Sequence, residues 1–186
     1  MELLTERLIL REFAKDDKHN LYKLFTEKFV STYEEHLQMK CISDVEDYLA
    51  FHTQNAISAD RTHFYFTIEL QVTHEFAGII GYTFVEEINQ NDITGRVAEL
   101  EYYLLEEHQG NGYMPEALKK ILSLAFEDDN TVKIFAQCRK SNVNSEKVML
   151  KCGMHKSVNQ PEPKVSYGML EERVRYELTA DNYIKA

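Results

Sequence analysis

The chain has 186 residues, 44% of them apolar and 28% charged, which is enough for one sizeable core and suits one domain better than two. No apolar run approaches the ~20 residues of a membrane-spanning helix, and the N-terminal stretch carries charges and lacks the small-residue cleavage site of a signal peptide. The net charge of −10 argues against broad nucleic-acid binding and against docking on an anionic membrane. It is compatible with a cationic amine as substrate, although acidity for solubility is the simpler explanation.

The chain has three cysteines, Cys41, Cys138 and Cys152, which are odd in number and far apart. This usage suits reduced thiols in a cytoplasmic protein. None of them forms a C-x-x-C pair, and the seven histidines show no metal-ligand spacing with them. We therefore expect buried cysteines that behave as small apolar residues, a cytoplasmic location and no metal.

The N-terminal half begins with a strand and two helices. Alternation of apolar and polar residues predicts a strand over Thr5–Phe13. Asp16-Asp17 can cap the helix that follows, and Ser43-Asp44 starts a second helix. β-Rich segments then predict further strands and turns: strands over His63–Leu70, Phe76–Val85 and Val97–Leu105, and turns at Gln71–Glu75 and Asn89–Asp92.

Helices and strands alternate in the C-terminal half. A helix is expected from about Tyr113 to Phe126, with Pro115 in its first turn, where a missing N–H costs nothing. A short helix over Ser145–Lys151 is closed by Gly153. The remaining strands are expected over Val132–Cys138 and Arg173–Thr179, with one more near Val165. This order predicts one α/β domain over residues 1–186, with a mixed sheet and helices on both faces.

The segment from Glu99 to Phe126 is the one that indicates chemistry. A strand runs into a glycine-containing loop, and the loop opens a helix. Unpaired N–H groups from about Gly110 to Met114 can point at one place, the helix dipole adds positive potential there, and glycine lets the backbone approach a phosphate closely. The pattern therefore predicts a phosphate or pyrophosphate ligand, with a plain tight turn as the alternative. It matches neither a P-loop nor a dinucleotide-binding fingerprint.

Six short motifs occur in order along nearly the whole chain. Gln109–Met114, before Pro115–Leu118, fits Q/R-x-x-G-x-G/A, except that Met114 replaces the last small residue. The others are T-x-R-L-x-L-R at Thr5–Arg11, G-x-x-G at Gly78–Gly81, A-E-I/L-x-Y at Ala98–Tyr102, N-x-x-S at Asn142–Ser145 and G-F/M at Gly153-Met154. Together they resemble the GNAT-type acetyltransferases, and more particularly the branch of ribosomal-protein N-terminal (Rim-type) acetyltransferases. Tyr102-Tyr103 departs from that branch, which often has glycine there.

The resemblance implies a single-domain GNAT-like fold, with a mixed, mostly antiparallel sheet of six to seven strands and about four helices. It also implies acetyl-CoA as co-substrate and no metal. Main-chain groups of Leu104 and Leu105 would pair with the pantetheine arm, and Asn142 would reach the pantetheine amides. For Leu104 a core position, and for Asn142 a turn or helix cap, is the alternative. The residues that would wrap the pyrophosphate are Gln109, Gly110, Asn111, Gly112, Tyr113 and Met114.

The implied chemistry is direct attack of a neutral amine on the thioester carbonyl, for which a base must remove a proton. Glu99 is the first candidate for the base, and Glu101, two residues along the same strand face, is the second; a solvated or salt-bridged glutamate is the alternative for each. Ser145 is the candidate proton donor to the departing thiolate, because the helix over Ser145–Lys151 contains no tyrosine. His108, beside the loop, is expected to be an exposed loop residue.

The expected function is transfer of acetyl from acetyl-CoA to a primary amine, either a protein N-terminus or a small amine. The acceptor cleft would be built from the second helix and the loops at 89–96 and 155–172, and Tyr167, Tyr176 and Tyr183 can line it. Those regions resemble no motif, so both acceptors stay open. The alternative class is a sensor or scaffold module that holds acetyl-CoA without turnover. A homodimer is left open.

Overall fold

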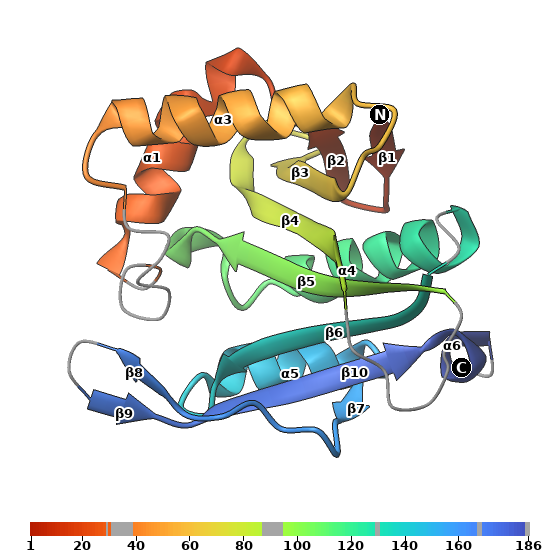
Figure 1. Cartoon of the computed structure of the whole chain (residues 1–186). Coiled ribbons are helices and arrows are strands. Elements are labelled where there is room, and N and C mark those ends of the chain that lie inside the picture. The colour runs from red at the N-terminus through yellow and green to blue at the C-terminus, as the bar shows by residue number, and fades with distance from the viewer. Residues whose placement is uncertain (29, 31–38, 87–94, 129–130, 167–168, 185–186) are drawn as a thin grey trace. The chain divides into compact units, whose positions relative to one another are not determined.

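A computed structural model describes residues 1–28, 30, 39–86, 95–128, 131–166 and 169–184 (Figure 1). The chain divides into two compact units, which are described separately. Unit 1 comprises Met1–Tyr82 and Glu101–Lys120, and unit 2 comprises Thr83–Leu100 and Ile121–Ala186. Strands β4 (Phe76–Val85) and β5 (Arg96–Leu104) and helix α4 (Tyr113–Ser123) contribute residues to both units.

Unit 1 contains antiparallel strands and the helices that follow them. Strand β2 pairs antiparallel with β1 and with β3, through Leu3↔Leu10 and Leu10↔Ile68. Helices α1 and α3 pack on each other, and α3 packs on β3 (Figure 1). The remaining elements are β1 (Glu2–Leu4), β2 (Leu8–Glu12), η1 (Lys15–Asp17), α1 (Lys18–Thr26), α3 (Ile42–Ala56), β3 (His63–Leu70) and η3 (Glu106–His108).

The local patterns explain where these elements begin. Leu8 and Leu10 are completely buried in β2, which confirms the predicted alternation. Asp17 occupies the predicted N-cap position of α1, but its side chain makes no capping hydrogen bond to that helix; its carboxylate accepts the Ala14 amide at 2.7 Å instead. The second helix begins one residue earlier than predicted: its N-cap is Cys41, and the carboxylate of Asp44 accepts the Cys41 amide at 3.1 Å.

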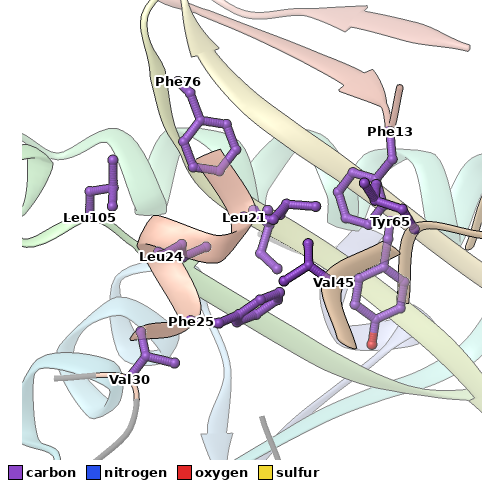
Figure 2. Close-up of a cluster of buried hydrophobic side chains, with 11 residues drawn as sticks. Phe13, Leu21, Leu24, Phe25, Val30, Val45, Tyr65, Phe76 and Leu105 are labelled. Atoms are coloured by element: carbon purple, nitrogen blue, oxygen red, sulfur yellow. The ribbon is translucent and has the colours of Figure 1, made fainter. Parts of the chain in front are cut away.

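An apolar cluster holds unit 1 together. Figure 2 shows Leu21, Leu24 and Phe25 of α1 beside Val45 of α3. Each of these four side chains is at most 1% exposed, and full burial of such a side chain stabilises a fold by roughly 1.5–3 kcal/mol. The other members of the cluster are Phe13, Val30, Leu49, Tyr65, Phe76, Ile79 and Leu105.

Unit 2 combines one parallel strand pair with antiparallel pairs. Its strand order is β5-β6-β10-β7; β5 runs parallel to β6 through Ala98↔Ile134, and β10 pairs antiparallel with β6 through Tyr176↔Ala136. Its elements are the π-helical turn η4 (Leu124–Asp128), β6 (Thr131–Arg139), α5 (Val143–Lys151), β7 (His155–Lys156), β8 (Lys164–Ser166), β9 (Met169–Glu171), β10 (Arg173–Thr179) and α6 (Ala180–Ile184).

The predicted α/β class with a mixed, mostly antiparallel sheet is confirmed. The strand predicted near Val165 is β8, which pairs with β9 outside the main strand order. The helix predicted to Phe126 is α-helical only to Ser123 and continues as the π turn η4. The turn at Asn89–Asp92 and the side chain of Tyr167 lie outside the described residues.

No disulfide joins the three cysteines; Cys138 and Cys152 are buried as expected, whereas Cys41 is exposed. No helix in the described part of the chain is long and apolar enough to cross a membrane. Over the described ranges, no cluster of three or more His, Cys, Asp or Glu side chains is arranged to hold a metal ion.

Candidate active site

The loop before α4 presents a row of main-chain amides. Gly110 and Gly112 both have φ of 79°, a left-handed conformation that glycine adopts without strain. The first α-helical bond of α4 runs from the Glu116 amide to the Gly112 carbonyl at 3.4 Å. Among the described residues, no acceptor is found for the amides from Gly110 to Met114. This is the arrangement that binds an anion at a helix N-terminus.

Side chains within the loop stabilise its shape. The Gln109 side-chain amide donates to the Leu104 carbonyl at 3.3 Å. The Asn111 side-chain amide donates to the carbonyls of His108 and Gln109, each at 3.2 Å. A Cβ added to Gly110 would have no heavy atom within 4 Å, and the Met114 side chain is only 4% exposed. The loop therefore offers its backbone, while Met114 turns into the interior.

The main chain at the end of β5 already makes several bonds within unit 1. The Leu105 amide donates to the Ala77 carbonyl at 2.9 Å, and the Leu105 carbonyl accepts the His108 amide at 3.0 Å. Both Leu104 and Leu105 have buried side chains. The Leu105 amide, which was predicted to pair with the pantetheine arm, is thus bonded to β4 in this structure.

The N-terminal strand region contacts the loop through Arg7. The Arg7 amide and the Thr5 hydroxyl donate to Oε1 of Glu116, at 2.8 and 2.6 Å. The Arg7 Nε and Nη2 atoms both lie 2.7 Å from Oε2 of Glu116, and Nη1 donates to the Asn111 carbonyl at 3.0 Å. The guanidinium also lies 4.8 Å from the centre of the Tyr113 ring. Glu116 lies in the first turn of α4. Arg7 therefore contacts both the start of this helix and the loop from Gln109 to Met114, which we call the anion loop after its predicted ligand.

His108 is buried at 9% exposure, so the expectation of an exposed loop residue is wrong. Its Nε2 atom has no hydrogen-bond partner among the described residues and lies 4.0 Å from the carboxylate of Glu107. The Asn111 side chain donates to the His108 carbonyl, and the centre of the Tyr113 ring lies 6.5 Å from that of His108.

Glu101 in unit 1 is surrounded by aromatic and imidazole rings. Its carboxylate accepts a hydrogen bond from the Tyr65 hydroxyl at 2.5 Å. The His52 ring centre lies 4.4 Å from that of Tyr65 and 4.3 Å from that of Tyr48.

Burial raises the pKa of Tyr48, and the charge of Glu101 raises it further. Burial lowers the pKa of His52 to about 4, and the nearby His63 adds to the decrease. His52 is therefore neutral at pH 7, beside a carboxylate.

Glu99 lies in unit 2, on the part of β5 that pairs with β6. It is partly buried, and its Oε1 atom accepts a hydrogen bond from the Gln137 side chain at 3.2 Å. Asn142 is the N-cap of α5, and its side-chain oxygen accepts the Ser145 amide at 3.1 Å. The helix-cap interpretation of Asn142 is therefore confirmed, and the bond places Ser145 in the first turn of α5.

The structure thus distributes the predicted residues over the two units. Glu101, Leu104, Leu105 and the loop from Gln109 to Met114 lie in unit 1, whereas Glu99, Asn142 and Ser145 lie in unit 2. Sequence reasoning missed His52 and Tyr65, whose positions on a helix and a strand gave no sign that they approach Glu101. It also missed the Arg7–Glu116 contact, although the motifs at Thr5–Arg11 and Pro115–Leu118 contain both residues.

Comparison with known proteins identifies the family to which this α/β fold belongs. The model of the acetyltransferase (GNAT) domain matches residues 7–155. The chain therefore belongs to the GNAT acetyltransferase family, which uses acetyl-CoA, and it is an N-acetyltransferase of that family.

Its relatives extend over most of the chain. The uncharacterized N-acetyltransferase YoaA from Bacillus subtilis is 27% identical over 154 residues, which is 83% of this chain and 82% of YoaA. Spermidine N-acetyltransferase from Vibrio cholerae, solved with CoA and spermine, has a TM-score of 0.78 at 20% identity and covers 95% of this chain and 98% of its own. A proposed ribosomal-protein-serine acetyltransferase from the same species has a TM-score of 0.74 at 20% identity, with 96% and 97% covered. These two likenesses show the fold.

Proposed function

We propose that the protein transfers the acetyl group of acetyl-CoA to a primary amine by direct attack in a ternary complex. The observation that carries the proposal is the row of five main-chain amides from Gly110 to Met114 at the start of α4. Amides at a helix N-terminus bind a pyrophosphate through hydrogen bonds and through the helix dipole. Binding there would hold the acetyl-CoA thioester near an amine and so raise the effective concentration of the reactants.

This proposal gives each residue the role that its motif implies. The loop from Gln109 to Met114 would bind the pyrophosphate, and main-chain groups at Leu104 would approach the pantetheine arm. Asn142, the cap of α5, would reach the pantetheine amides, and Ser145 would donate a proton to the departing CoA thiolate. The attacking amine must be neutral, so a carboxylate removes its proton before or during attack.

The contacts favour Glu101 over Glu99 as this base. The Tyr65 hydroxyl orients the Glu101 carboxylate, and the charge of Glu101 acts on the nearby side chains of Tyr48 and His52. Aromatic faces next to a carboxylate also stabilise an ammonium group before it loses its proton. Glu99 is bonded instead to the neutral amide of Gln137, and it stays as the second candidate.

A small cationic amine is the acceptor that these features support best. The net charge is −10, Glu101 lies among aromatic rings, and one similar structure is a spermidine N-acetyltransferase. A protein N-terminus is the second candidate, because the motifs resemble the Rim-type branch and because of the likeness to a proposed ribosomal-protein-serine acetyltransferase. We further propose that residues 1–186 act as one acetyltransferase domain. A cytoplasmic location also stays a prediction, supported by three cysteines that form no disulfide.

The test is release of CoA thiol from acetyl-CoA across a panel of polyamines, monoamines and short peptides with free N-termini, measured together with CoA binding by calorimetry. Glu101→Gln should lower kcat/KM by about 10²–10⁴-fold, the usual effect of removing a general base, and leave the Kd for CoA unchanged. Glu99→Gln is measured in parallel, and Glu107→Gln, an exposed glutamate of the same charge, is the control.

Each outcome separates two interpretations. Loss of rate in Glu99→Gln alone would make Glu99 the base. Full rates in both variants would contradict a glutamate base. Saturable CoA binding without thiol release on any amine would favour a sensor or scaffold module.

A further inference from the structure

We infer that Arg7 is a positioning residue for acetyl-CoA: by holding the Asn111 carbonyl and Glu116 together, it aims the main-chain amides of the anion loop. This inference rests on the proposed function, because it assigns that loop to the cofactor. Arg7 is 109 positions from Glu116 and 104 from Asn111 in the chain, so the contact is a product of the fold.

The geometry of one peptide unit explains how a carbonyl contact aims an amide. The carbonyl of Asn111 and the N–H of Gly112 belong to the same planar peptide group, and in a trans peptide they point in opposite directions. No cis peptide occurs in the described residues. Because Arg7 Nη1 holds the Asn111 oxygen on one side at 3.0 Å, the Gly112 N–H is directed to the other side. The pairing therefore fixes the direction of an amide in the middle of the proposed pyrophosphate site.

The second half of the contact fixes the helix on which the loop ends. Glu116 receives four donors from the N-terminal segment: the Thr5 hydroxyl, the Arg7 amide, and Nε and Nη2 of Arg7. Burial opposes ionisation of Glu116, but these hydrogen bonds outweigh it and lower its pKa. Glu116 is thus a carboxylate at neutral pH, and the start of α4 is held against the N-terminal segment.

The arrangement requires the shape of arginine as well as its charge. Three nitrogens of one planar guanidinium contact two acceptors, the Glu116 carboxylate and the Asn111 carbonyl, and a lysine ammonium on a flexible stem does not reproduce this fork. Pairing with Glu116 also compensates the positive charge, so the effect on an anionic ligand comes mainly from orientation. A Cβ on Gly112 would lie 3.5 Å from Nη2 of Arg7, so the guanidinium lies directly beside the loop backbone.

A surface ion pair next to the loop provides a matched control. Lys23 Nζ lies 2.7 Å from the carboxylate of Glu107, and both side chains are more than half exposed. Lys23→Met removes one positive charge from unit 1 and one ion pair close to the loop, as Arg7→Met does. It disturbs no contact to the loop backbone. A purely electrostatic effect on CoA binding would therefore appear in both variants.

The experiment measures the Kd for CoA by calorimetry and the KM for acetyl-CoA and kcat by thiol release. It uses the full chain with Arg7→Lys, Arg7→Met, Glu116→Gln and Lys23→Met. We expect Arg7→Lys and Arg7→Met to weaken CoA binding and raise KM by about 10-fold or more, the usual effect of losing one hydrogen bond to a charged group. At saturating acetyl-CoA, kcat should stay within about 3-fold, and Lys23→Met should change Kd less than about 2-fold. The double variant Arg7→Met/Glu116→Gln should bind CoA no more weakly than the weaker-binding single variant, because both changes break the same contact.

The results distinguish failure of the inference from failure of the proposed function. If the unaltered protein shows no saturable CoA binding, the proposed function fails. If it binds CoA and Arg7→Lys binds equally well, the positioning role of Arg7 is wrong and the function stands. A fall in thermal stability with unchanged Kd and KM would also overturn the inference, because it would make the contact structural only.

Discussion

Glycines in this chain are required for two separate physical reasons. A Cβ on Gly78 would lie 2.1 Å from the Tyr103 carbonyl oxygen, and one on Gly81 would lie 2.5 Å from the Phe64 carbonyl oxygen, so no larger residue fits. Gly110 and Gly112 have space for a Cβ, but their φ of 79° strains any other residue. The G-x-x-G motif therefore serves strand packing in unit 1, and the G-x-G motif serves the backbone conformation of the anion loop.

The ionisation of His52 makes the stability of the fold depend on pH. Its pKa in the folded protein is about 4, against 6.5 for an ordinary histidine, mainly because of burial. Between these values the unfolded chain binds more protons than the folded chain. Stability contributed by neutral His52 is therefore fully present above about pH 6.5 and is lost as pH falls toward 4, with a total loss of about 3 kcal/mol.

We predict that His52→Phe reduces the loss of unfolding free energy between pH 7 and pH 4 by about this amount relative to the unaltered protein. The measurement is urea unfolding at several pH values, taken as a difference between variants so that the titration of shared carboxylates cancels. His19→Gln, at an exposed position on α1, is the control and should keep the full pH dependence. Parallel curves for His52→Phe and the unaltered protein would show that His52 does not titrate in this way.

At the level of elements, local signals located the starts of α1, α3, α4 and α5 to within two residues. Asn142 caps α5, and Asp44 accepts the amide of Cys41 at the start of α3. The end of the helix after Tyr113 was not predicted, because the apolar pattern continues through the π turn Leu124–Asp128 with no residue that breaks a helix. Helix starts are marked by side chains that accept backbone amides, whereas this change of helix type has no such marker.

The two roles assigned to Asn142 can be separated. Asn142→Ala should lower the free energy of unfolding by about 1 kcal/mol, since it removes the acceptor of the Ser145 amide. Asn142→Asp keeps an acceptor and should retain most of that stability. If Asn142 also donates to the pantetheine arm, as predicted, Asn142→Asp should still weaken CoA binding. Chemical denaturation measures the free energy of unfolding, and calorimetry measures CoA binding. The control Asn144→Ala, at an exposed position of the same helix turn, should change neither quantity.

For the whole molecule, the relevant quantity is the net charge of −10. A field of this sign attracts a cationic amine and repels CoA, whose phosphates are negative, and added salt screens both effects. In the proposed function, the main-chain amides from Gly110 to Met114, held in place by Arg7, would bind the cofactor against an unfavourable long-range field.

We predict opposite salt dependences for the two substrates. Raising NaCl from about 20 to 200 mM should lower kcat/KM for a polyamine several-fold and leave the KM for acetyl-CoA unchanged or lower, because the Debye length falls below about 10 Å. Initial rates at each salt concentration measure both effects, and a monoamine of lower charge should show a shallower slope than the polyamine. Equal slopes for the two amines would mean that the net charge does not steer the acceptor.

The sequence by itself determined the α/β class, most strand positions, the glycine loop before α4 and the family. These features depend on short-range patterns: alternation over Thr5–Phe13, glycines at 110 and 112, and caps next to helices. Only the tertiary structure decided that Arg7 reaches Asn111 and Glu116 more than 100 positions away, and that Tyr65 binds Glu101. It also decided that His108 is buried and that the Leu105 amide bonds to Ala77. The physical reason is that periodicity and turn chemistry act over a few residues, whereas contacts between distant residues depend on how the elements pack.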